Sequence, residues 1–137
     1  MNHFVERARR LTWYEIAGLG QAALALCRVA LGLRRHDFKE LLRRLRLDQR
    51  MPLAESWLVE QEARHVRWAH RLVPLEANCL LDSVATAALV RRKGFSVPLV
   101  IGVQNDGGAL HAHAWLGSPS PEDARKFRPL LRVPSED

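Results

Sequence analysis

Ala77-Asn78-Cys79-Leu80-Leu81-Asp82-Ser83 is the stretch that decides the fold, together with His111-Ala112-His113-Ala114-Trp115 further along the chain. The first stretch predicts a helix that opens at a cysteine. Asn78 is a favoured N-cap residue, and Gly94 suits the position just after a helix C-terminus. The second stretch alternates, and it predicts a strand with both histidines and Trp115 on one face. We therefore expect one helix and one hairpin to bring a thiol and an imidazole together.

Three further helices are predicted before this stretch. They are expected over 11–35, 37–47 and 53–72, from apolar residues at helical spacing, with Thr12 and Asp37 as N-cap residues of the first two. The first is interpreted as a buried helix, with membrane-surface contact and a membrane span as alternatives. Its glycines, Gln21 and Arg28 make it a poor spanning segment. Cys27 lies on its apolar face and is expected to be inert core.

After Gly94 the apolar pattern changes from helical to strand spacing. Residues 97–103 are β-branched and apolar, 105–108 form an Asn-Asp-Gly-Gly turn signal, and 110–116 alternate, so a hairpin is expected. The tail from Gly117 onward is rich in proline, serine and charge, and it predicts one short helix over 122–127. The expected fold class is α+β, with a helical N-terminal half packed on a small antiparallel sheet.

The length and charge of the chain limit its organisation and its partners. A chain of 137 residues is expected to form one domain, with a helical lead-in (1–73) and a second part (74–137) that holds the cysteine helix, the hairpin and the tail. The net charge of +6 suggests nucleic acid, anionic lipid or an acidic peptide as partner, or simply solvated arginine faces. The basic residues are not interleaved with exposed aromatics, which argues against single-stranded nucleic acid.

The cysteine content indicates the compartment and the absence of a metal site. Two cysteines are too few for a disulfide framework, and 1–10 is polar and charged without the apolar segment of a secretory signal. We therefore expect a cytoplasmic protein with reduced thiols. The cysteine spacing does not match a zinc site, and no cofactor is expected.

A cysteine at a helix N-terminus is suited to nucleophilic catalysis. The positive end of the helix dipole and the unpaired backbone N–H groups favour a thiolate, and the same N–H groups can stabilise an oxyanion. A histidine within reach would act first as base and then as acid, with an acidic residue to fix its tautomer. Spacing alone leaves a structural cysteine as the more frequent case. Asp82 is interpreted as a complement to the helix dipole, because its charge would oppose thiolate formation.

Short motifs around this pair define a family resemblance. They are Val66-Arg67-Trp68-Ala69, the run from Pro74 to Leu81, Arg91-Arg92-Lys93-Gly94, Ile101-Gly102-Val103 and His113-Ala114-Trp115. On these motifs the segment 66–116 resembles the lasso-peptide maturation protein B family, in its leader-peptidase part. The resemblance implies a transglutaminase-like, papain-like cysteine protease core. It also implies an enzyme that removes the leader from a ribosomally synthesised peptide precursor.

The resemblance also implies the site residues. Cys79 matches the family nucleophile and His113 the general base, while His111 lacks the Ala-Trp that follows the family histidine and is interpreted as a neighbour. The family places an acidic residue on the strand after the histidine strand. That strand looks shortened or absent here, so Asp123 is the first choice and Glu122 the second. A backbone carbonyl, or a dyad without a third member, is the remaining alternative.

Partners follow from the same resemblance. They are the precursor peptide, a separate leader-binding protein, and an ATP-dependent cyclase that acts after cleavage. Because nothing before Leu11 resembles a leader-binding domain, a stand-alone peptidase is expected. Two alternatives stay open: transfer of the acyl group to an amine instead of water, and a non-catalytic basic module that binds a peptide while Cys79 is merely buried.

Overall fold

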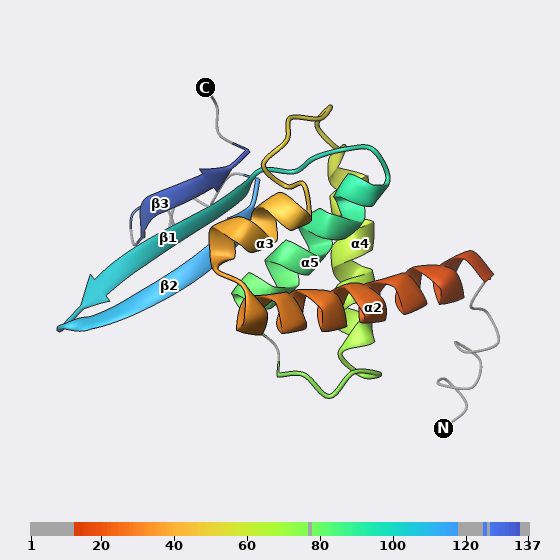
Figure 1. Ribbon diagram of the computed structural model, residues 1–137, viewed down its shortest axis with the longest axis horizontal. Coiled ribbons are helices and arrows are strands. Elements are labelled where there is room, and N and C mark those ends of the chain that lie inside the picture. Colours follow the sequence, from red (N-terminus) through yellow and green to blue (C-terminus); the bar gives the residue numbers. More distant parts are fainter. Residues whose placement is uncertain (1–12, 77, 118–124, 126, 135–137) are drawn as a thin grey trace.

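The computed structural model describes residues 13–76, 78–117, 125 and 127–134, which form helices and a small antiparallel sheet (Figure 1). In chain order the elements are α2 (Trp13–Arg35), α3 (Phe38–Arg44), α4 (Ser56–Ala69), α5 (Cys79–Arg92), β1 (Leu99–Asp106), β2 (Ala109–Leu116) and β3 (Arg128–Val133). The predicted α+β class and the helical first half are confirmed. The predicted cap Thr12 lies outside the described residues.

Helix α5 lies at the centre of the molecule, in contact with α2, α4, β1 and β2 (Figure 1). Leu81 and every residue of 84–90 are buried, so this helix has almost no solvated face beyond its first turn. Ala85, Ala87 and Ala88 are small, which lets neighbouring elements pack closely on several sides. The core around α5 includes Ala22, Leu26, Val29, Val66, Ala69, Leu99 and Ala114.

Helix α2 buries one face and exposes the other. Ala22, Leu26 and Val29 are fully buried, while Trp13, Ile16, Leu24 and Leu31 on the opposite side are exposed. Cys27 was predicted to be inert core, and this prediction is wrong because Cys27 falls on the outer face, in line with Leu24 and Leu31. The segment Glu15–Arg35 is long and apolar enough to cross a membrane, and only 22% of its apolar window is buried. Core helices and signal sequences meet the same length and composition test.

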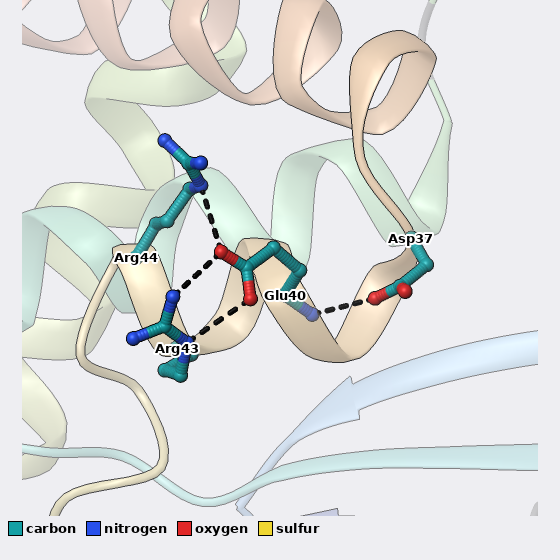
Figure 2. Close-up of polar contacts among 4 residues, drawn as sticks. All are labelled: Asp37, Glu40, Arg43 and Arg44. Atoms are coloured by element: carbon teal, nitrogen blue, oxygen red, sulfur yellow. Dashed lines mark hydrogen bonds and ion pairs between the residues drawn. The ribbon is translucent and has the colours of Figure 1, made fainter.

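Helix α3 begins at the predicted cap. Asp37 is extended, and its Oδ1 accepts a hydrogen bond of 2.8 Å from the backbone N–H of Glu40 (Figure 2). Glu40 in turn accepts hydrogen bonds from Arg43 and Arg44, one helical turn further on. The hydrogen bond from Arg43, with the positive charges of both arginines, lowers the pKa of Glu40 to about 2. The carboxylate therefore stays ionised throughout the physiological range.

A buried ionic cluster joins α4 to the end of α5. Glu62 is 2% exposed, and it forms an ion pair with Lys93, just beyond the last residue of α5. Its second oxygen lies 3.4 Å from Nδ1 of the buried His65. The His65 ring also packs against Gly18 of α2, where an added Cβ would lie 2.6 Å from the ring. Contacts of Glu62 and His65 on α4 therefore hold this helix against α2 and against the end of α5.

The sheet has the strand order β2-β1-β3, with all neighbours antiparallel. The predicted hairpin is confirmed, with Asp106 paired to Ala109 and a two-residue turn of Gly107 and Gly108. Both glycines have positive φ, 58° and 90°, which is the requirement of a type I′ turn. Alternation places Ala114 and Leu116 against the helices and His113 and Trp115 on the other face.

Strand β3 was not predicted from the sequence. Pro129 and Pro134 made this segment look like a tail, because proline cannot donate to a sheet ladder. The structure accommodates Pro129 since β3 is an edge strand and its register with β1 shifts between Ile101 and Gly102. Ile101 pairs with Leu131 and Gly102 with Pro129, so Leu130 is left over as a bulge.

Lys93→Met is predicted to destabilise the protein by about 3 kcal/mol, because it leaves the carboxylate of Glu62 buried without a positive partner. Urea unfolding measures the loss. The matched control is Arg92→Met, which removes the same charge from an exposed neighbour at the same helix end. Equal free energies of unfolding for the two variants would mean that the ion pair contributes nothing.

Candidate active site

Cys79 is the first residue of α5, and the local sequence explains why the helix starts there. Asn78 is extended, with φ −146° and ψ 129°, and its Oδ1 accepts hydrogen bonds from the N–H groups of Leu80 at 2.8 Å and Leu81 at 3.3 Å. The cap thus occupies two of the N–H groups of the first turn. Within the described part of the chain, the backbone N–H of Cys79 has no such partner. The cysteine itself is exposed.

Cys79 and His113 line the same pocket. This pocket has a volume of about 340 Å³, and it is lined by Asn78, Cys79, Leu80, Ile101, His113 and Ala114. β2 is an edge strand, which lets residues from both of its faces border one hollow. No hydrogen bond joins Cys79 to His113 among the described residues, so the structure brings the two residues to one pocket without a direct contact.

The ring of His113 is held by two aromatic side chains. It stacks on Phe127, with centroids 5.4 Å apart and an interplanar angle of 29°, and it meets Trp115 edge-on at 4.9 Å. Trp115 and Phe127 also contact each other edge-on at 5.3 Å. These contacts restrict the imidazole, as a residue that positions a proton requires. The sequence analysis missed Phe127, because it precedes the strand that was not predicted.

Gly102 makes room for this aromatic cluster. It pairs with His113 across the β1–β2 ladder. A Cβ at this position would lie 2.8 Å from the Trp115 ring and 3.1 Å from Cβ of Phe127. The glycine of the Ile101-Gly102-Val103 motif is therefore explained by the close approach of two side chains.

Gly102→Ala is predicted to displace Trp115 and Phe127, to loosen the His113 ring and to destabilise the protein by about 1–3 kcal/mol through overpacking. Urea unfolding and the near-ultraviolet circular dichroism of the aromatic side chains measure both effects. Gly20→Ala is the control, since nothing lies within 4 Å of the added methyl. It should be neutral or stabilising by up to about 1 kcal/mol. An unchanged aromatic signal in Gly102→Ala would contradict the packing role.

The acidic position of the site is not filled by β3. The expectation of a shortened or absent strand is wrong, because β3 spans Arg128–Val133; it pairs with β1 rather than β2. The strand carries no acidic residue. Asp123 and Glu122, the two predicted candidates, both lie outside the described residues. None of the described residues that line the pocket is acidic.

A second histidine lies close to the cysteine helix and was missed by the sequence analysis. His70 Nε2 lies 2.6 Å from Oδ1 of Asp82, and His70 Nδ1 lies 3.0 Å from the backbone carbonyl of Leu75. Asp82 is in the first turn of α5, and His70 is the C-cap residue of α4. Their contact therefore joins the end of α4 to the start of the cysteine helix. No spacing rule links the two residues, which are brought together by the path of the loop.

The surroundings of His70 favour its protonated form. Both ring nitrogens lie within hydrogen-bond distance of oxygen atoms, and only the protonated ring can donate from both nitrogens. The hydrogen bond to Asp82 is the main cause that raises the pKa of His70 above its ordinary value, and the Leu75 carbonyl adds to it. When His70 is protonated, its positive charge offsets the negative charge of Asp82, one turn from Cys79. The protonated ring therefore reduces the opposition of Asp82 to a thiolate that the sequence led us to expect.

His70→Ala is predicted to lower the free energy of unfolding by about 1 kcal/mol, and the loss should depend on pH. Because the folded-state pKa of His70 is raised, its contribution is complete below the unfolded pKa and disappears as pH rises through the folded value. Unfolding of both proteins across this window measures the difference. Asp82→Asn should remove the same pH dependence. A loss that stays constant with pH would contradict the charged pair.

No group of three or more His, Cys, Asp or Glu side chains is placed to hold a metal ion within 13–76, 78–117, 125 and 127–134.

Comparison with protein families assigns the chain to a family. The model of a family described as "Transglutaminase-like superfamily" matches residues 23–132, which include α3, α4, α5, β1, β2 and all of β3 except Val133. No curated protein and no solved structure matches the chain.

Proposed function

Because the chain belongs to the transglutaminase-like superfamily, we propose that it is a cysteine peptidase that removes the leader from a lasso-peptide precursor. The superfamily suggests acyl chemistry of the cysteine protease or acyltransferase type. The observation that carries the proposal is the shared pocket of Cys79 and His113, with the cysteine exposed at a helix N-terminus. The motifs that resemble the lasso-peptide family support the narrower assignment.

Cys79 acts as the nucleophile in this proposal. His113 takes the thiol proton, and Sγ attacks the carbonyl carbon of the scissile peptide bond. The oxyanion that forms accepts a hydrogen bond from the backbone N–H of Cys79, which is oriented by the helix start. When the C–N bond breaks, His113 returns the proton to the departing amine and the leader remains as a thioester. Water, deprotonated by His113, then attacks the thioester and releases the leader carboxylate and the thiol.

Asp123 is proposed to orient His113, with Glu122 as second choice and a backbone carbonyl as the remaining option. An acceptor on one ring nitrogen fixes the tautomer in which the other nitrogen can accept the thiol proton. Trp115 and Phe127 restrain the His113 ring but supply no hydrogen-bond acceptor. A separate acceptor is therefore needed to fix the tautomer.

The proposed partners are the precursor, a separate leader-binding protein and an ATP-dependent cyclase. The amine released by cleavage is the group that such a cyclase would join to a side-chain carboxylate. We place these steps in the cytoplasm, in keeping with exposed cysteines that need a reducing environment.

Cys79→Ala is predicted to abolish cleavage, with a loss of at least about a thousandfold in kcat/KM, and to retain precursor binding. The assay mixes the purified protein, precursor and leader-binding protein without the cyclase, and follows the products by mass spectrometry. Cys27→Ala is the matched control and should cleave normally, because Cys27 is also exposed but lies on α2, outside the pocket. His113→Ala should lose about a hundredfold or more.

The same assay separates the alternatives. An amine adduct in place of two cleaved products would assign acyl transfer, because the thioester would then have reacted with an amine. Unchanged biological function in Cys79→Ala would assign a binding module. An intact precursor, with all components folded and bound, would contradict the peptidase.

A further inference from the structure

A second hollow lies at the opposite end of α5 from Cys79. It has a volume of about 430 Å³ and is lined by Leu24, Ala25, Arg28, Val29, Arg44, Leu45, Arg46, Ala88, Leu89, Arg91 and Arg92. We call it the arginine pocket, because five of these residues are arginines. None of its described lining residues is acidic. The positive charge of the chain is therefore concentrated at a concave site as well as spread over solvated helix faces.

The five arginines come from three elements that are separate in sequence. Arg28 lies on α2, Arg44 ends α3 and Arg46 follows it, and Arg91 and Arg92 end α5. Arg91 and Arg92 also complement the dipole of α5, because they lie at its C-terminal end. Arg28 lies in the interior of α2, so the helix dipole does not explain its presence. Tertiary packing brings the charges together, at the electrostatic cost of placing like charges around one hollow.

Few polar partners inside the described chain offset this charge. Glu40 accepts a hydrogen bond of 3.1 Å from Arg44, but it is shared with Arg43 (Figure 2). Arg91 donates to the neutral Gln49 at 3.2 Å, and its Nε is buried without a hydrogen-bond partner among the described residues. A buried N–H donor without an acceptor is costly, so the guanidinium of Arg91 is incompletely satisfied by the described part of the chain.

Arg46 is held in an unusual backbone conformation. Its φ is 60°, in the left-handed region, at the turn that follows α3. Glycine or asparagine is the usual residue at such a position, and another residue costs roughly 1–2 kcal/mol there. The chain therefore keeps an arginine at the rim of the pocket where glycine would be more stable. Strained residues of this kind concentrate at binding and catalytic sites.

The pocket adjoins an exposed apolar stripe of α2. Leu24 belongs to both, and it is 54% exposed. Trp13, Ile16 and Leu31 lie in line with it along the same outer face of the helix. The two features together form a surface with guanidinium groups on one side and apolar side chains on the other.

We infer that the arginine pocket and the adjoining α2 stripe bind an acidic peptide segment that also carries apolar side chains. Guanidinium groups bind carboxylates through paired, charge-assisted hydrogen bonds, and the accessible Leu24 and Leu45 can contact apolar side chains. A flat anionic bilayer would reach the outer arginines but would not fill a concave site, whereas a peptide side chain can enter it. Nucleic acid is less well matched, because no aromatic side chain lines the hollow for base stacking.

This site is separate from the proposed active site. Residues 88–92 lie nine to thirteen positions beyond Cys79 on the same helix, which corresponds to roughly 14–20 Å along its axis. The inference therefore does not rest on the peptidase proposal, and it can be tested in protein that has no nucleophile.

The test uses Cys79→Ala protein and fluorescence anisotropy with a short labelled peptide of Glu, Leu and Ala. The triple variant Arg28→Gln, Arg46→Gln, Arg92→Gln is expected to weaken binding by at least about tenfold. The matched control, Arg34→Gln, Arg35→Gln, Arg71→Gln, removes the same charge from exposed positions outside the pocket and should bind within about twofold of the parent. A peptide with Gln in place of Glu should not bind.

Arg46→Gly separates binding from folding. Glycine relieves the left-handed strain, so the melting temperature should stay equal or rise while peptide affinity falls. Equal affinity loss in both triple variants would overturn the inference in favour of net charge. Tight binding of the Gln peptide would overturn it in favour of apolar contact. Binding of anionic lipid vesicles that depends on the pocket arginines, without peptide binding, would assign the surface to a membrane.

Discussion

The burial of α5 on several sides is the constraint on which the rest of the structure depends. A helix whose residues from Val84 to Val90 are all buried cannot shift along or about its axis without clashes with α2, α4 and the sheet. The two ends of α5 are therefore held in place relative to the other helices and the sheet. One end presents Cys79 beside β2, and the other presents Arg91 and Arg92 to the arginine pocket. The ion pair of Glu62 with Lys93 fixes the second end further.

The start of α5 combines a neutral cap with a balanced charge. Asn78 satisfies two N–H groups without adding a negative charge beside the thiol, as aspartate would do at the same position. The carboxylate in the first turn of α5, Asp82, is hydrogen-bonded to His70. The helix dipole thus acts on Cys79 while this carboxylate is already engaged.

Features with a local cause could be predicted from the sequence, and features with a tertiary cause could not. The caps at Asp37 and Asn78 and the glycine turn of the hairpin follow from residue type, and the structure confirms each of them. The exposure of Cys27 was missed because α2 is apolar on both faces, so its pattern does not show which face is covered.

Strand β3 and the contact of His70 with Asp82 were missed for related reasons. The strand contains Pro129 and is followed at once by Pro134, so it is acceptable only as an edge strand with a bulge, which is a property of the sheet and not of the segment. The His70 contact depends on a loop path that has no periodicity. For the candidate site, the shared pocket of Cys79 and His113 could be anticipated, whereas the packing of His113 on Phe127 required β3.

The two-residue turn at Gly107-Gly108 also determines which face of the sheet carries His113. Side chains of a strand alternate strictly, so an insertion of one residue in this turn would slip β2 by one position against β1. The small core residue Ala114 would then exchange faces with His113, and the imidazole would be driven toward the alanine-rich helix, where there is no room for it. The length of this loop therefore determines whether His113 can line the pocket with Cys79, although neither glycine is among the pocket's lining residues.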